Sequence, residues 1–200
     1  METKKKILLH SCCAPCSTAV IERLKDEFDI SIFYYNPNIY PEEEYLKRKN
    51  EELRYIDILH KTQPEVNIDI IDCDYDSESY YQAVKGYENE REGGARCAIC
   101  FKLRLEKTGE MAKKLGYDYF GTTLTVSPHK NSEVINSIGI ALEKKIGVKF
   151  LVSNFKKQDG YKRSVQLAKE NELYRQNYCG CEFALKIQQI EAPESLNKKY

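Results

Sequence analysis

The sequence lacks any long hydrophobic run, and this absence limits where the protein can work. No apolar stretch approaches the roughly 18 residues that a membrane-spanning helix needs. Residues 1–6 are basic, but the apolar stretch that follows, residues 7–9, is far shorter than the roughly 7 to 15 residues of a secretion signal. We therefore expect a cytoplasmic protein without membrane partners, whose thiols stay reduced and serve metal binding or redox chemistry rather than structural disulfides.

The chain also lacks low-complexity segments, internal repeats and net charge. Its 200 residues carry 31 basic and 31 acidic side chains, and 42% of the residues are hydrophobic. These values predict a single domain over residues 1–200. The charge is nevertheless uneven, with a net of −7 over residues 65–92 and a net of +5 over residues 141–175. The basic stretch is suited to a phosphate backbone, although solvated helix faces carry similar charge.

Strand and helix patterns alternate along the chain, which is typical of a parallel sheet covered by helices on both faces. Strands are expected at residues 6–11, 30–35, 66–71, 117–123 and 149–152. Helices are expected at residues 16–26, from Pro41 onward, 77–85, from Cys97 to Gly116, 131–146 and 159–171. The predicted fold class is therefore α/β.

Seven of the eight cysteines fall into three tight groups, which are Cys12-Cys13-x-x-Cys16, Cys97-x-x-Cys100 and Cys179-x-Cys181. The first group follows the first expected strand. Open α/β sheets bind ligands at the carboxyl ends of their strands, so the three groups could converge at that edge. The remaining cysteine, Cys73, stands alone and is expected to be a core or surface thiol rather than a ligand.

The number of clustered thiols favours more than one metal. Four thiolates complete an iron–sulfur cube or a structural zinc site, and three remain. A metal held by three ligands keeps an open position, at which it can bind substrate and act as a Lewis acid. Seven thiols are therefore better explained by a cluster beside a reactive second site than by one structural metal.

Two other interpretations remain open at this point. Cys13 and Cys16 follow a strand and open a helix, as the thiols of a dithiol oxidoreductase do, and a helix amino terminus lowers a thiol pKa. That interpretation leaves five clustered cysteines without a role. Alternatively, four cysteines hold one zinc ion in a nucleic-acid-binding module that has no catalytic activity.

Four ordered motifs resemble the QueH family of epoxyqueuosine reductases. They are LLHSCCAPCS at residues 8–17, FYYNPNI at residues 33–39, Arg96-Cys97-x-x-Cys100, and Tyr178-Cys179-Gly180-Cys181. Together they cover nearly the whole chain. The resemblance implies a Rossmann-like fold of the HUP type, with a parallel sheet, helices on both faces and an added C-terminal cysteine-bearing helical segment.

The resemblance also implies an activity. Members of this family reduce the epoxide of epoxyqueuosine, in the wobble nucleotide of a tRNA anticodon, to the cyclopentene of queuosine, and they do so without cobalamin. The expected cofactors are a [4Fe-4S] cluster and a second mononuclear iron or other divalent metal. The expected partners are the tRNA that carries epoxyqueuosine and an external electron donor.

Roles for individual residues are expectations of the same kind. We expect Cys13, Cys97, Cys100 and one of Cys179 and Cys181 to bind the cluster, and Cys12 with the other to bind the second metal. Cys16 could serve either site or neither, and Cys12, Cys16 and His129 are the expected catalytic residues. His129 could supply a proton, although it also fits an ordinary surface turn. The expected substrate-binding residues are Tyr35, Asn36, Asn38, Arg96, Lys130, Lys157 and Arg163.

Overall fold

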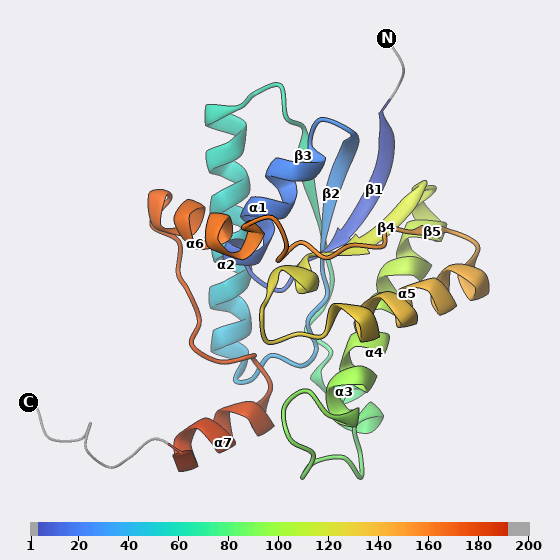
Figure 1. Ribbon diagram of the computed structural model, residues 1–200, viewed down its shortest axis with the longest axis vertical. Coiled ribbons are helices and arrows are strands. Elements are labelled where there is room, and N and C mark those ends of the chain that lie inside the picture. Colours follow the sequence, from blue (N-terminus) through green and yellow to red (C-terminus); the bar gives the residue numbers. More distant parts are fainter. Residues whose placement is uncertain (1–3, 192–200) are drawn as a thin grey trace, which may run out of the picture.

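The strands form one parallel sheet in the order β3-β2-β1-β4-β5 (Figure 1). A computed structural model describes residues 4–191 of the chain. The strands are β1 (Lys5–His10), β2 (Phe28–Tyr34), β3 (Ile68–Asp72), β4 (Tyr119–Thr122) and β5 (Lys149–Phe150). The strand order reverses between β1 and β4. Open α/β sheets bind ligands at such a switch point, outside the carboxyl ends of the strands.

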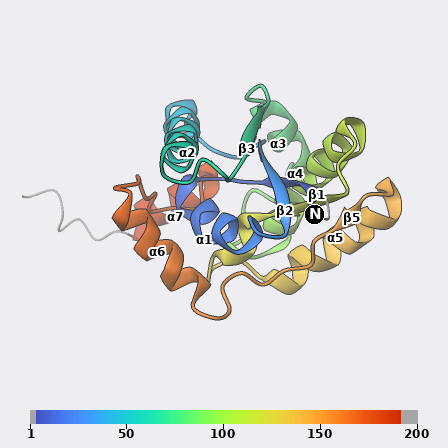
Figure 2. The same ribbon diagram turned by 90° about the horizontal axis from the view of Figure 1, so that it is seen from above.

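Helices cover both faces of the sheet (Figure 2). One face packs against α1 (Ala14–Leu24), α2 (Glu42–Thr62) and α6 (Gly160–Glu170), and the other against α4 (Ala95–Leu115) and α5 (Ser132–Ile146). Successive strand residues point to opposite faces. Accordingly, Ile7 and Leu9 of β1 belong to the first core, and Leu8 belongs to the second.

Two short helices lie beyond the carboxyl ends of the strands, α3 (Ser77–Ala83) and α7 (Glu182–Glu191) (Figure 1). Cys179 and Cys181 immediately precede α7, so the predicted cysteine-bearing helical segment is confirmed, with its cysteines just ahead of the helix. Within residues 4–191, no helix combines the length and the apolar character that a membrane span requires.

The predicted strands and helices are confirmed, with shifts at several ends. Helix α1 begins at Ala14 rather than residue 16, because Cys13 is its N-cap and Pro15 lies in its first turn, where a missing N–H does no harm. Helix α4 begins at Ala95, so Cys97 already lies inside it. Gly116 ends α4 as predicted, in a left-handed conformation with φ of 73°. The short 3-10 helix η1 (Thr123–Val126) was not predicted.

Candidate metal centre

The first cysteine group forms a compact thiol cluster between β1 and α1. The Sγ atoms of Cys12, Cys13 and Cys16 all lie within 4.8 Å of one another. Cys12 and Cys13 are buried and Cys16 is half-buried. Among the side chains of the described residues, no second set of three potential ligands is as close. Three soft ligands at this spacing suit a thiophilic metal such as iron or zinc.

The three thiols are electrostatically unequal. Hydrogen bonds from the Cys13 and Cys16 thiols hold the pKa of Cys12 well below its usual range, although burial opposes the shift. The hydrogen bond with Cys12 raises the pKa of Cys13 to about 12, and it also raises the pKa of Cys16. Cys12 is therefore the thiol of this cluster that ionises first.

A buried carboxyl group supports the cysteine turn from α2. The Ser17 hydroxyl donates to Glu52 Oε1 at 2.5 Å, and the Ser11 hydroxyl donates to Glu52 Oε2 at 3.0 Å. Ser11 Oγ also accepts from the backbone N–H of Cys13 at 3.3 Å. Burial raises the pKa of Glu52 to about 7. The two hydroxyl groups thus connect the start of α1 to a carboxyl group in the protein interior.

His10, at the end of β1, fixes the carboxyl edge of the sheet. Its Nε2 lies 3.1 Å from the backbone oxygen of Tyr35, and its Nδ1 lies 3.1 Å from Thr122 Oγ1. Because a carbonyl oxygen only accepts, Nε2 carries the proton and Nδ1 accepts from the threonine hydroxyl. Burial lowers the pKa of His10 to about 3, so the ring is neutral and joins β1 to the ends of β2 and β4.

The other four clustered cysteines lie at the start of α4 and just before α7. Cys100 and Cys181 are buried in one small core with Tyr80, and Cys179 packs against that core. Cys97 Sγ accepts from the backbone N–H of Gly93 at 3.2 Å. Segments far apart in the chain thus bring the second and third groups together.

Lys130 links this second set of thiols to the first. Burial opposes the charged form of its ammonium group, but the nearby Cys179, Cys12 and Cys16 outweigh that effect and raise its pKa. A positive charge therefore lies between the thiol cluster of β1–α1 and the thiol that precedes α7.

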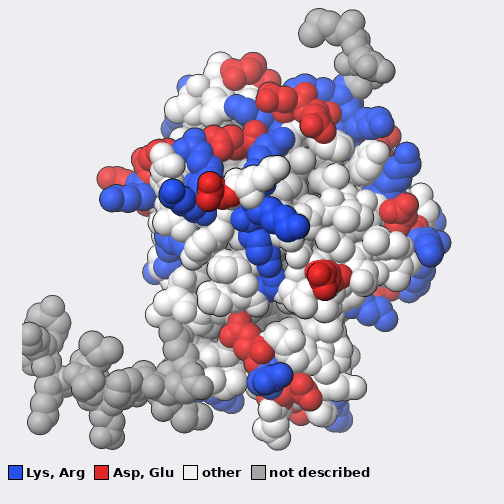
Figure 3. Space-filling model, viewed as in Figure 1, with Lys and Arg blue, Asp and Glu red and all other residues white. Residues whose placement is uncertain are grey.

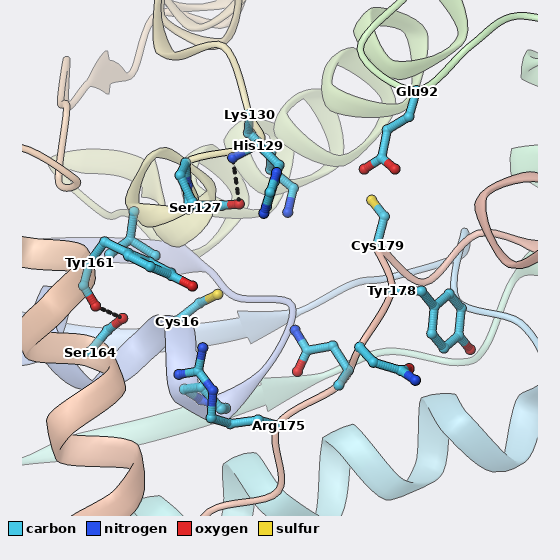
Figure 4. A pocket seen from close by; sticks show the side chains of 15 residues that line it. Cys16, Glu92, Ser127, His129, Lys130, Tyr161, Ser164, Arg175, Tyr178 and Cys179 are labelled. Atoms are coloured by element: carbon cyan, nitrogen blue, oxygen red, sulfur yellow. Dashed lines mark hydrogen bonds between the residues drawn. The ribbon is translucent and has the colours of Figure 1, made fainter. Parts of the chain in front are cut away.

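A cavity of about 300 Å³ opens beside the thiols, at the switch point between β1 and β4 (Figure 4). Cys16 and Cys179, one from each set, line it together with His129 and Lys130 from the segment after η1. Tyr161 of α6 supplies an aromatic wall, and Arg175 contributes a cation. Tyr178 also borders the cavity, but its ring lies against the guanidinium group of Arg48. An adjoining cavity of about 390 Å³ shares His129, Lys130 and Cys179 with the first.

The expected catalytic histidine and the expected substrate-binding residues divide into cavity-lining, surface and buried groups. His129 is exposed and Lys130 is half-buried, and both line the cavity. Lys157 is exposed, and Arg163 forms an ion pair with Glu22 at 2.6 Å. The structure places neither of these two against the cavity.

Two residues of the buried group, Asn36 and Arg96, donate hydrogen bonds to backbone oxygens. Asn36 is 1% exposed and donates to the backbone oxygen of Ser11 at 2.8 Å, which explains its role as a turn residue. Tyr35 and Asn38 are also buried. Arg96 is 1% exposed and donates to the backbone oxygen of Glu88 at 2.8 Å, so it supports the loop before α4 and presents no charge to a phosphate at the surface.

Several residues of the site were not predicted from the sequence. His10 lies within the quoted motif next to the cysteines, and Arg104 lies four residues after Cys100, on the same face of a helix. Their closeness to the cysteines in the sequence is the signal that could have identified His10 and Arg104 as residues of the site. Nothing in the sequence pointed to Glu52, or to Gln176, whose Nε2 donates to Cys13 Sγ at 3.0 Å.

Comparison with known proteins gives consistent matches. A family model described as Epoxyqueuosine reductase QueH matches residues 7–187. A protein of that name from Streptococcus pyogenes serotype M1 is 43% identical, over 94% of this chain and 73% of its own length. A protein of that name from Staphylococcus epidermidis is also 43% identical, over 94% of this chain and 79% of its own length. One from Thermotoga maritima is 38% identical, over 96% of both chains.

One solved structure aligns with most of this chain. The U34-tRNA thiolase NcsA from Methanococcus maripaludis, with its [4Fe-4S] cluster, aligns with a TM-score of 0.47 and 11% identity. The alignment covers 94% of this chain and 66% of that chain, slightly less than two thirds of its length.

Proposed function

This chain belongs to the QueH family of epoxyqueuosine reductases, and we propose that it reduces epoxyqueuosine to queuosine in the wobble nucleotide of a tRNA anticodon. The reaction takes up two electrons and two protons, breaks both C–O bonds of the epoxide, forms a C=C bond and releases the oxygen as water. The observation that carries the proposal is the cluster of Cys12, Cys13 and Cys16 beside a cavity, within the matched residues.

The residues of the site fit the expected cofactors. Seven thiols approach from three segments, and Lys130 supplies positive charge for an anionic centre. We assign Cys13, Cys97, Cys100 and one of Cys179 and Cys181 to a [4Fe-4S] cluster, and Cys12 with the other to a second mononuclear iron or other divalent metal. When bound, these groups would supply electrons and a Lewis acid for the epoxide oxygen. The chain would therefore need no cobalamin.

The chain's own side chains would bind the nucleotide and provide a proton. Tyr161 presents aromatic surface to the cavity, on which an unstacked base can lie. His129 is exposed at the cavity wall, and an imidazole can transfer a proton to the departing oxygen near neutral pH. An external electron donor and the modified tRNA would meet the enzyme in the cytoplasm.

The dithiol interpretation is not favoured. A redox pair of Cys13 and Cys16 would leave Cys12 and the four cysteines of the second and third groups without a role. The family match likewise favours an enzyme over a zinc-organised binding module.

Cysteine variants test the proposed function. Protein purified without oxygen should contain more than about four irons and about four acid-labile sulfides per chain, and reductant should bleach its visible absorbance. Cys12→Ala should keep much of the iron but lose turnover of epoxyqueuosine tRNA, because Cys12 is assigned to the second metal. Cys73→Ala is the matched control, since Cys73 lies outside the three groups, and it should retain both iron and activity.

The metal content decides between the interpretations. Loss of all iron from Cys12→Ala would refute the partition of the ligands. Wild-type protein that holds only about one zinc and no sulfide would refute the proposed chemistry.

A further inference from the structure

Three arginines lie in the protein interior around the thiols. Arg48, Arg96 and Arg104 are each at most 2% exposed. Arg48 Nη1 donates to the backbone oxygen of Cys179 at 3.3 Å, and Arg104 Nε donates to that of Cys100, also at 3.3 Å. A buried guanidinium group is costly unless an opposite charge and hydrogen bonds compensate for its lost hydration.

Arg48 has a carboxylate partner, and Arg96 has several backbone partners. Arg48 forms an ion pair with Glu44 at 2.7 Å. Arg96 donates to backbone carbonyl groups of its loop, including that of Glu88, and lies over the ring of Phe183 at 4.8 Å. The ion pair accounts for the burial of Arg48, whereas Arg96 is compensated only in part, because its buried Nε and Nη2 have no hydrogen-bond partner and it forms no ion pair among the described residues.

Arg104 has fewer partners than either of them. Among the described residues, it forms no salt bridge with a carboxylate, and its buried Nη2 has no hydrogen-bond partner. Its other contacts are one carbonyl oxygen, that of Cys100, and the ring of Phe101 at 5.7 Å from the guanidinium carbon. Arg104 thus carries a buried positive charge that no carboxylate in the described part of the chain balances.

Thiols from all three cysteine groups would stabilise the charge of Arg104 in their ionised forms. Burial opposes its charged form, but Cys100, Cys12 and Cys179 outweigh that effect and raise its pKa. These cysteines belong to α4, to the turn after β1 and to the segment before α7. Arg104 is therefore placed where a thiolate-bound centre would supply the missing negative charge.

We propose that Arg104 is the counter-charge of the thiolate-bound iron centre and that its fixed positive charge raises the reduction potential of that centre. The inference rests on the proposed function, because it requires iron at these thiols. One-electron reduction, with dithionite as the electron donor, makes the centre more negative by one charge. A buried cation stabilises that added charge more strongly than a solvated one, because the surrounding dielectric is low.

The test is a potentiometric titration of the iron-loaded protein, followed by its visible absorbance. Arg104→Gln removes the charge and should shift the midpoint potential downward by at least about 59 mV. For a one-electron reduction, this shift is a tenfold decrease in the ratio of reduced to oxidised protein at a fixed potential. Arg104→Lys keeps the charge and should remain close to wild type. Arg54→Gln is the matched control, because Arg54 pairs with Glu51 at the surface of α2.

The outcomes separate this inference from the proposed function. An unchanged midpoint in Arg104→Gln would overturn the role of Arg104 and leave the proposed function intact. Wild-type protein without iron would overturn both. If Arg104→Gln folds, as circular dichroism would show, but binds no iron, iron in Arg104→Lys would support the charge role. If both variants fold but neither binds iron, the packing of the guanidinium group matters rather than its charge. That result would overturn the proposed charge role of Arg104.

Discussion

At the scale of single residues, the buried carboxyl group of Glu52 is the main pH-sensitive group beneath the site. It is fully buried, and its partners are the neutral hydroxyl groups of Ser11 and Ser17, with the Cys12 thiol nearby. Burial raises its pKa from 4.5 to about 7, whereas the unfolded chain ionises near 4.5. The stability that this group contributes is therefore complete below about pH 4.5 and is lost as the pH rises through about 7.

Glu52→Gln should become more stable than the wild type as the pH rises. The variant keeps polar contacts to both serines but cannot ionise, so its free energy of unfolding should gain about 3 kcal/mol relative to wild type between about pH 5 and about pH 8. Denaturant unfolding of the metal-free, reduced proteins measures this difference. Glu51→Gln should show no such gain, because Arg54 lowers the pKa of Glu51. A difference independent of pH would contradict the account.

Single residues also show why only part of the site could be predicted from the sequence. The cysteines were recognised because their spacing is a property of the sequence. Arg104 and Glu52 resemble ordinary helix-surface charges in sequence, and their importance arises only because both are buried. Arg96 and Asn36 were expected to contact the substrate, and the sequence likewise did not reveal that both are buried.

At the scale of elements, the contact between α1 and α6 positions one wall of the cavity. Arg23 of α1 donates to the backbone oxygens of Lys157 and Gln158, at 2.9 and 2.8 Å, in the segment that leads into α6. Gly160 begins α6 there, and a Cβ atom on it would lie 1.8 Å from the backbone oxygen of Phe155. Only glycine permits this approach, and it places the next residue, Tyr161, at the cavity.

Gly160→Ala should therefore destabilise the protein by roughly 2 kcal/mol or more, because a backbone segment must move to admit the methyl group. Gly116→Ala provides the comparison. Its site has open space but a φ of +73°, so only backbone strain of about 1 kcal/mol is expected. Denaturation midpoints measure both, and an equal or smaller effect at Gly160 would contradict the close packing of α6.

Element boundaries were predictable where local signals agreed with packing. Gly116 ended α4 as expected, whereas the strand predicted through residue 123 ends at Thr122 as β4. The Thr122 hydroxyl accepts from the backbone N–H of Leu124 at 3.1 Å and starts η1 instead. Such a side-chain cap competes with strand pairing, and residue propensity alone does not reveal it.

At the scale of the whole molecule, charge suits the proposed tRNA partner on the side of α6. Figure 3 shows Lys and Arg side chains gathered over α6 and the segment before it, next to the wall that carries Tyr161. This surface belongs to the basic stretch at residues 141–175. The sequence predicted the charge, and the fold brings it beside the cavity.

Lys157→Gln and Lys162→Gln should each weaken binding of the anticodon stem-loop and lower the salt dependence of log Kd by up to about one per lost phosphate contact. Fluorescence anisotropy at several salt concentrations measures both quantities. Lys145→Gln is the control, because Lys145 pairs with Glu106 near the end of α5, away from the cavity. Equal losses in all three variants would contradict a tRNA surface on the side of α6.

The central claim is tested most directly by the mass of the wobble nucleoside after reaction. Iron-loaded protein, a chemical reductant and tRNA containing epoxyqueuosine would be incubated without oxygen, and the digested tRNA would be analysed by mass spectrometry. The account predicts a nucleoside lighter by one oxygen atom, with no deuterium on carbon when the reaction is run in D₂O, because the C=C bond forms without adding hydrogen to carbon. An unchanged mass, or a gain of one water from hydrolysis of the epoxide, would contradict it.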